Sequence, residues 1–159
     1  MMQNSSPTSP VVGKEKLLRA AQHAFSRYGY VGSSVRTICQ EAQLDGSMIA
    51  HHFGSKANLW LAVLNHLATQ QQKHLQQLEQ ALTQAATATE RFILAGNALL
   101  DLFAALPDIA LFVNQELGHP GERLDQINTR LIQPGYALCG PIWQESMKNG
   151  MLRTQNPVI

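Results

Sequence analysis

Apolar residues recur at every third or fourth position along most of this chain, which is the spacing of one face of an α-helix. The longest such series begins after Lys56 and consists of Trp60, Val63, Leu64, Leu67, Leu75, Leu78 and Leu82. No segment alternates apolar and polar residues with the period of two that a half-buried strand requires. The chain is therefore predicted to be all-α.

Cap and turn residues divide this helical pattern into separate elements. Gly29 is placed to end the first helix, and Ser33-Ser34, Asp45, Ser55 and Thr89 are placed to begin later ones. Residues 1–12 are polar and contain two prolines, so they are predicted to form a disordered tail. The expected helices span residues 13–28, 35–42, 46–52, 56–86, 90–105, 107–117 and 121–149.

The charge of the chain is unevenly distributed. Residues 1–60 carry six Lys and Arg against three acidic residues, whereas residues 61–159 carry six against eight. A basic N-terminal module beside an acidic body favours a polyanionic partner for the module. Hydrophobic residues make up 45% of the chain and charged residues 14%, which excludes disorder for most of it.

Several classes of function are not expected. The apolar stretch 92–113 contains Asp101 and Pro107, so it is predicted to form two core helices and no membrane span. Two cysteines a hundred residues apart, with no export signal before them, indicate reduced thiols and a cytoplasmic protein. No catalytic constellation is present. His51 and His52 point about 100° apart on a helix, so neither a metal nor a cofactor is expected.

Two short helices joined by a tight turn behind a longer helix are the parts of a DNA-reading helix-turn-helix. Two runs carry a more specific likeness: K-L-L-R-A-A-Q-H-A-F-S-R-Y-G-Y-V-G-S-S-V-R-T-I-C-Q-E-A from Lys16, and I-A-H-H-F-G-S-K-A-N-L-W from Ile49. Together they resemble the tetracycline-repressor (TetR) family of bacterial transcription regulators. The likeness is dense over residues 16–64, and the rest of the chain is similar mainly in the number and length of its helices.

The resemblance implies a DNA-binding site in this N-terminal part. Arg36 matches a family position that can reach a guanine edge, and Lys56 matches the family's phosphate clamp. From the residues themselves, Gly46 and Ser47 permit close approach to DNA, and Met48 offers a contact to a thymine methyl group. The remaining predicted contacts are polar groups placed to meet the DNA backbone: Ser33, Ser34, His51 and His52.

The chain departs from the family pattern around this site. Ala50 and His51 stand where the family usually has tyrosines, and Gln43 replaces the usual turn glycine. Asp45 places a carboxylate at the helix end that faces DNA, where it caps the helix but repels phosphate. The apolar residues around the turn are predicted to form the core of the module: Phe25, Ile38, Leu44, Ile49, Phe53 and Leu59.

The resemblance also implies a division of the chain. Residues 13–60 are expected to form the DNA-binding domain, and residues 61–159 a helical domain that binds an unknown small-molecule effector and forms a homodimer on a palindromic operator. The sequence ends at the point where the family's last two helices, which form the dimer interface, normally follow, so this domain is expected to be short. Candidate effector contacts are His66, Phe103, Phe112, Gln115, Tyr136, Cys139 and Trp143; ordinary core packing is the alternative for each.

Two functions remain open from the sequence. The first is a ligand-responsive DNA-binding regulator, a repressor that a small molecule releases from its operator. The second is an all-α interaction module that has kept the fold and no longer binds an operator, which the missing tyrosines and the short C-terminus would favour.

Overall fold

The computed structural model describes residues 10–152, and over these residues it contains helices and no strand. The all-α prediction is therefore confirmed. In chain order the elements are α1 (Pro10–Gly32), α2 (Val35–Ala42), α3 (Ser47–Phe53), α4 (Lys56–Leu82), α5 (Ala88–Ala105), α6 (Pro107–Leu117), α7 (Glu122–Ile127), a π-helical segment η1 (Asn128–Ile132) and α8 (Gln133–Lys148).

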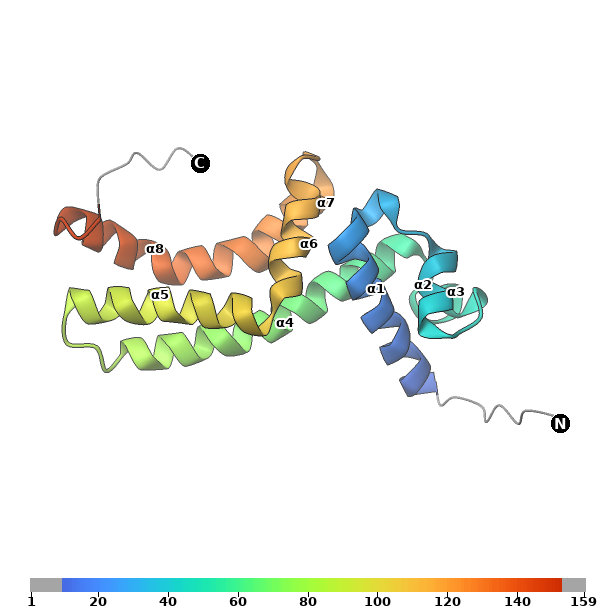
Figure 1. Ribbon diagram of the computed structural model, residues 1–159, viewed down its shortest axis with the longest axis horizontal. Coiled ribbons are helices and arrows are strands. Elements are labelled where there is room, and N and C mark those ends of the chain that lie inside the picture. The colour runs from blue at the N-terminus through green and yellow to red at the C-terminus, as the bar shows by residue number, and fades with distance from the viewer. Residues whose placement is uncertain (1–9, 153–159) are drawn as a thin grey trace.

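The first three helices pack at one end of the molecule around the start of α4 (Figure 1). Their core contains four of the six residues predicted for it, Phe25, Ile38, Ile49 and Leu59, all buried. Leu44 and Phe53 are half-buried and pack against the same cluster. The apolar spacing of the sequence thus identified the inside of this module.

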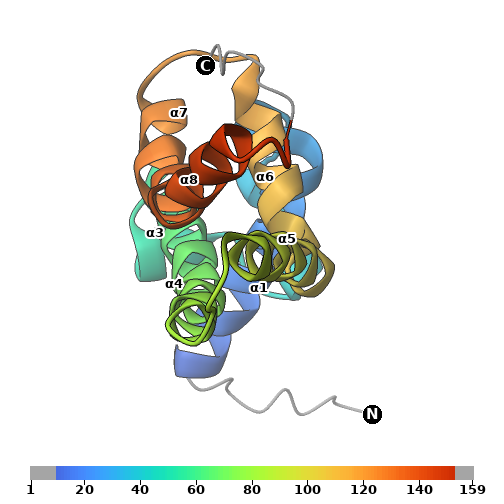
Figure 2. The ribbon, with the colours of Figure 1, turned by 90° about the vertical axis from the view of Figure 1, so that its left-hand side faces the viewer.

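Helix α4 joins this module to the rest of the molecule. Its 27 residues correspond to about 40 Å of helix. Figure 1 shows its N-terminal end among α1–α3 and its C-terminal end beside α5, with α8 running along the same part of the body. The end-on view in Figure 2 shows α4, α5 and α8 as neighbouring rods, with α6 crossing at a steep angle.

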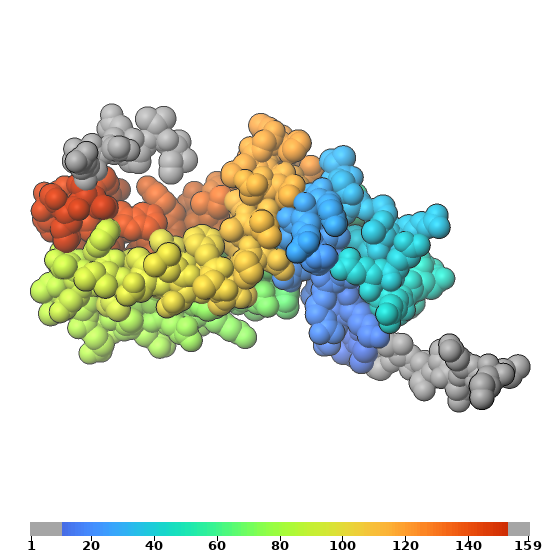
Figure 3. Space-filling model, viewed as in Figure 1, coloured from blue at the N-terminus to red at the C-terminus, as the bar shows by residue number. Residues whose placement is uncertain are grey.

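Helix α6 bridges the body and the N-terminal module. It turns away from α5 by 88° at the break before Pro107, and it lies against α1, as the space-filling view in Figure 3 also shows. The side chain of Gln22 in α1 donates to Asp108 (2.7 Å), and Gln115 in α6 donates to the carbonyl of Arg27 (2.9 Å). No single helix within residues 10–152 is long and apolar enough to cross a membrane, although α5 and α6 together meet that length and composition.

The start of α1, the end of α4 and the start of α5 differ from the sequence prediction. Residues 10–12, assigned to the tail, form the first turn of α1, since a proline is well tolerated where the first N–H groups of a helix lack partners; the rest of that tail, residues 1–9, lies outside the described residues. Helix α4 ends at Leu82, four residues early, and α5 begins after Thr87. The cause is a capping box in which Thr87 accepts from the Glu90 N–H (3.1 Å) and the Glu90 carboxylate accepts from the Thr87 N–H (3.1 Å).

The predicted long C-terminal helix is interrupted by a π turn. The N–H of Gln133 donates to the carbonyl of Asn128, five residues earlier. Pro134 follows directly; it has no N–H, and in a regular α-helix its ring would collide with the carbonyl of Arg130. The wider π turn accommodates this proline, whereas Pro141 stays inside α8.

Gly29 marks the real end of the first helix. Its backbone angles (φ 69°, ψ 178°) interrupt α1 in a region that only glycine occupies readily, and a β-carbon there would lie 3.2 Å from the Gln115 side-chain oxygen. We expect Gly29→Ala to lower the free energy of unfolding by about 1–3 kcal/mol, measured by urea denaturation. Gly118→Ala is the matched control because its β-carbon would meet open space. Equal stability of the two variants would contradict this explanation.

Candidate DNA interface and effector pocket

The turn between α2 and α3 is built by local capping. Ser34 is the N-cap of α2, and its hydroxyl accepts from the Thr37 N–H at 3.0 Å. Gln43 ends α2 in the left-handed conformation (φ 57°, ψ 43°) that the missing glycine would adopt more easily. The N-cap of α3 is Gly46, and the carboxylate of Asp45, one residue before it, accepts from the Ser47 N–H at 2.8 Å. This hydrogen bonding to Ser47 lowers the pKa of Asp45, which keeps the carboxylate charged.

One face of the α2–α3 unit is open to solvent. Arg36 is exposed on α2, Gly46 is exposed at the N-cap of α3, and Ser47, Ala50 and His51 are exposed on α3. A β-carbon at Gly46 would meet nothing within 4 Å. A helix with small residues at its exposed N-terminal end and an arginine on the neighbouring helix has the shape and charge needed to enter a DNA groove.

Three of the predicted DNA contacts face inward instead. Ser33 is buried, and its hydroxyl donates to the Gly29 carbonyl at 2.7 Å, so it has no free group for a phosphate. Met48 is half-buried against the core of the module. His52 is also half-buried, and its buried Nε2 lies 3.4 Å from where a Gly13 β-carbon would stand. Successive side chains of a helix point in different directions, so those of α3 divide between the core and the outer face. Met48 and His52 lie on the inner side.

Lys56 lies at the N-terminus of α4, half-buried against an aromatic ring. Its ammonium nitrogen is 4.4 Å from the centre of the Tyr30 ring, and the guanidinium of Arg123 lies at the same distance from that centre. Arg123 in turn donates to Glu116, which is buried, at 2.9 Å. Burial, and secondly the charge of Arg123, lower the pKa of Lys56. The predicted phosphate clamp therefore touches the body of the protein.

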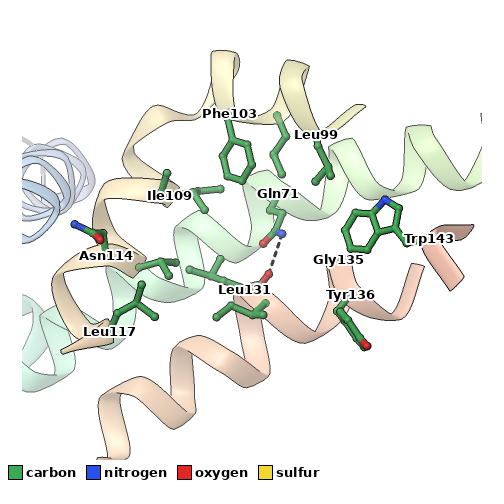
Figure 4. Close-up of a pocket in the computed structure, with 14 residues that line it drawn as sticks. Gln71, Leu99, Phe103, Ile109, Asn114, Leu117, Leu131, Gly135, Tyr136 and Trp143 are labelled. Atoms are coloured by element: carbon green, nitrogen blue, oxygen red, sulfur yellow. Dashed lines mark hydrogen bonds between the residues drawn. The ribbon is translucent and has the colours of Figure 1, made fainter. Parts of the chain in front are cut away.

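A pocket of about 420 Å³ opens between the helices of the body (Figure 4). Its wall combines side chains from α4, α5, α6, η1 and α8. Most of them are apolar, and the residues that line it are Gln71, Leu99, Leu102, Phe103, Ile109, Ala110, Val113, Asn114, Leu117, Leu131, Ile132, Gly135, Tyr136 and Trp143. This size and chemistry are typical of a site for a small organic ligand.

Three of the seven predicted effector contacts line this pocket: Phe103, Tyr136 and Trp143. The others have structural roles or lie elsewhere. Phe112 is buried and stacks on Trp60 with ring centres 5.2 Å apart. The side-chain amide of Gln115 donates to the backbone carbonyl of Arg27 in α1. His66, on α4, does not line the pocket.

Cys139 is the remaining predicted effector contact that the structure places elsewhere. It is fully buried in a second apolar cluster with Leu78, Ala95 and Ile142. Burial raises the pKa of its thiol, as it does for Cys39 in the N-terminal module. Both sulfur atoms are therefore poor nucleophiles, and neither is placed to sense an effector.

Sequence reasoning missed most of the pocket wall, although the sequence contains two signals of it. Gln71 is a polar residue in the middle of the apolar series of α4, and it is buried at the pocket. Pro134 disrupts the C-terminal helix, and the residues beside it, Leu131, Ile132, Gly135 and Tyr136, line the same pocket. Buried polar groups and broken helices are both features around which ligand sites form.

Comparisons with known proteins agree with this geometry. The family model described as bacterial regulatory proteins, tetR family, matches residues 17–63. A transcriptional repressor of Mycobacterium tuberculosis, Rv3405c, is 26% identical over 136 residues, which cover 79% of this chain and 72% of the relative. The repressor AcnR of Corynebacterium glutamicum is 35% identical over 54 residues, 34% of this chain and 29% of the relative.

The chain is thus similar to the tetR family of bacterial regulatory proteins over residues 17–63, and to a transcriptional repressor over most of its length. The relatives named above are regulators, and neither is an enzyme by name. The TetR-type module found by the family model covers α1 from Leu17, α2, α3 and the start of α4, which are the elements that present the exposed α2–α3 face.

Solved structures share the TetR fold over nearly the whole chain. The hemolysin II regulator HlyIIR superposes with a TM-score of 0.72 at 23% identity, covering 93% of this chain and 80% of that one. FadR of Bacillus subtilis, solved in complex with stearoyl-CoA, superposes with a TM-score of 0.63 at 20% identity, covering 88% of this chain and 74% of that one.

Proposed function

We propose that this protein is a TetR-family repressor that binds its operator through the exposed face of α2 and α3 and leaves it when a small molecule fills the body pocket. The observation that carries this proposal is the solvent-open face of α3 beside Arg36. Ser34, Arg36, Gly46, Ser47 and His51 supply the contacts on that face, with Lys56 at its edge. Residues 13–60 are the DNA-binding part, and residues 61–159 the effector-binding and dimerising part.

The effector acts through α6 in this proposal. One side of α6 lines the pocket, at Ile109, Val113 and Leu117, and the same helix holds α1 by the hydrogen bonds of Asp108 and Gln115. A ligand that prefers a different position of α6 therefore shifts α1 and the reading helix with it, by its difference in affinity for the two positions. FadR was solved in complex with stearoyl-CoA, and the apolar acyl chain of that ligand supports an effector with an apolar part for a pocket of this lining.

Two further properties complete the proposal. A homodimer places two copies of α3 about 34–36 Å apart, one turn of DNA, so that the pair reads a palindrome. The protein acts in the cytoplasm, where the DNA is. The second candidate, an interaction module without DNA binding, has no comparable support, because the face that would read DNA is not covered by the rest of the described chain.

Arg36 and Lys56 are expected to contribute to operator binding in different ways. Arg36→Ala should cost about 1–3 kcal/mol on the preferred sequence and little on random DNA, because it removes the interaction with a base edge. Lys56→Ala should weaken binding to all sequences and reduce the slope of log K against log[salt] by about 0.9 for each phosphate that the protein no longer neutralises. The measurement is fluorescence anisotropy with DNA flanking the protein's own gene and with random DNA, at several salt concentrations.

Lys73→Ala is the control for this pair, since Lys73 is exposed on the part of α4 that belongs to the body. It should leave both the affinity and the salt slope unchanged. Wild-type protein that binds neither its flanking DNA nor random DNA at low salt would refute the proposed function and favour the interaction module.

A further inference from the structure

The lining of the body pocket contains no charged side chain among the residues that the structure describes. Its polar side chains are Gln71, Asn114, Tyr136 and Trp143. Of these, Asn114 and Tyr136 are exposed and Trp143 is half-buried. A ligand group that carried a full charge into this space would lose its hydration without gaining a counter-charge, which is strongly unfavourable. The buried part of the ligand must therefore be neutral.

Gln71 is the polar group that lies deepest in the pocket wall. Its side chain is on α4 and the residue is only 6% exposed. The amide nitrogen donates to the carbonyl of Leu131 at 2.9 Å, as the dashed line in Figure 4 shows. This hydrogen bond fixes the orientation of the amide. Its oxygen, an acceptor with two lone pairs, remains available to accept from a ligand.

An acceptor of fixed orientation in the pocket wall selects a ligand by its donor. Within residues 10–152, the hydrogen bond to Leu131 is the one that the structure gives the Gln71 side chain. A ligand that places a hydroxyl or N–H group at the Gln71 oxygen completes the hydrogen bonding of the amide, while a ligand without a donor leaves this oxygen desolvated and unpaired. Discrimination of this kind adds to that available from apolar contacts.

We propose that the pocket takes an uncharged, largely apolar molecule that carries a hydrogen-bond donor, and that Gln71 accepts from this donor through Oε1. This inference rests on the proposed function, since it names the chemistry of the effector that the repressor would sense. The apolar side chains of α5 and α6, Leu102, Phe103 and Val113, hold the hydrocarbon part of the molecule. The volume of about 420 Å³ accommodates a two-ring aromatic compound.

Three matched probes test the proposal by calorimetry on the full chain without DNA: 1-naphthol, 1-methoxynaphthalene, which lacks the donor, and 1-naphthoate, which is charged. We expect 1-naphthol to bind about fivefold more tightly than the methyl ether and at least about tenfold more tightly than the carboxylate. Equal affinity for naphthol and its ether, tighter binding of the carboxylate, or no binding of naphthol overturns the proposal.

Two variants assign the preference to Gln71. Gln71→Met keeps the length of the side chain and removes the acceptor, so the naphthol-to-ether ratio should fall to about one while affinity for the ether is retained. Gln72→Met is the control because Gln72 is exposed and lies outside the lining. If Gln71→Met does not fold, the ratio of naphthol affinity to ether affinity in the wild-type protein still tests the proposal. Because these measurements contain no DNA, failure to bind an operator would refute the proposed function and leave this result standing.

Discussion

Phe112→Ala is expected to lower the free energy of unfolding by about 3–5 kcal/mol, the usual cost of removing a buried phenyl ring from a packed core. Phe112 is 1% exposed and stacks on Trp60, with ring centres 5.2 Å apart and planes inclined by 25°. Trp60 belongs to α4 and Phe112 to α6, so this stack joins the two helices that connect the N-terminal module to the body. Removal of the ring opens a cavity at that junction.

Urea denaturation followed by circular dichroism measures this effect. Phe103→Ala is the matched control, because the Phe103 side chain is 46% exposed at the mouth of the pocket. Phe103→Ala should cost little stability and weaken the binding of a pocket ligand. Phe112→Ala should cost much stability and leave the binding of a pocket ligand largely unchanged. A Phe112→Ala protein that keeps its stability but no longer binds ligand would support the interpretation of Phe112 as an effector contact.

The opposite roles of these two phenylalanines show what the sequence reveals and what it leaves out. The sequence analysis predicted both as candidate effector contacts, with core packing as the alternative for each. Helical spacing indicated the order of the helices, most of their ends and the core of the N-terminal module. It could not distinguish a ring that faces a neighbouring helix from one that faces a pocket. That distinction depends on the angle between α5 and α6, which the packing of α6 on the distant helix α1 helps to set.

Prediction of the DNA-reading helix was limited in a similar way. Its position followed from the turn and cap residues, but a seven-residue helix has side chains in all directions, and the orientation around its axis was not fixed by the pattern. The structure therefore places His51 outside and His52 inside. The pattern also did not indicate that Ser33 is buried, with its hydroxyl donating to the carbonyl of Gly29 at the kink in α1.

Long-range polar contacts were beyond prediction altogether. Nothing in the sequence around Lys56 points to Arg123, which is far away in the chain and reaches the same tyrosine ring. Local capping pairs such as Thr87 with Glu90 have a short and recognisable spacing, whereas pairs across the fold have none. Such contacts become visible only when the packing of the helices is known.

Arg123→Met is the second change with a large expected effect. Glu116 is 3% exposed in its side chain, and Arg123 donates to it at 2.9 Å from a side chain that is 36% exposed. Removing the arginine leaves a buried carboxylate without its partner, which costs about 3–5 kcal/mol in fully buried pairs. Because Arg123 is partly open to solvent, we expect the lower end, about 3 kcal/mol, in the free energy of unfolding by urea denaturation at pH 7.

A double-variant cycle separates the effect of the ion pair from the effect of packing. Glu116→Gln removes the charge that Arg123→Met would leave unpaired, so the protein with both changes should be more stable than Arg123→Met alone. If the double variant is less stable than either single one, the packing of Arg123 on Tyr30 matters more than its charge. A stability of Arg123→Met within about 0.5 kcal/mol of the wild type, as for an ordinary surface pair, would contradict the ion-pair explanation.

The same variant also tests whether the body influences Lys56, the proposed phosphate contact. The charge of Arg123 contributes to the lowered pKa of Lys56, after the larger effect of burial. Arg123→Met should therefore raise the pKa of Lys56 toward that of a free lysine, which NMR titration of the ammonium group measures directly. Operator affinity should change with it, because Lys56 also has one neighbour fewer on the Tyr30 ring and becomes freer to move. An unchanged Lys56 titration together with unchanged operator binding would show that Arg123 supports the fold without reaching the DNA-binding site.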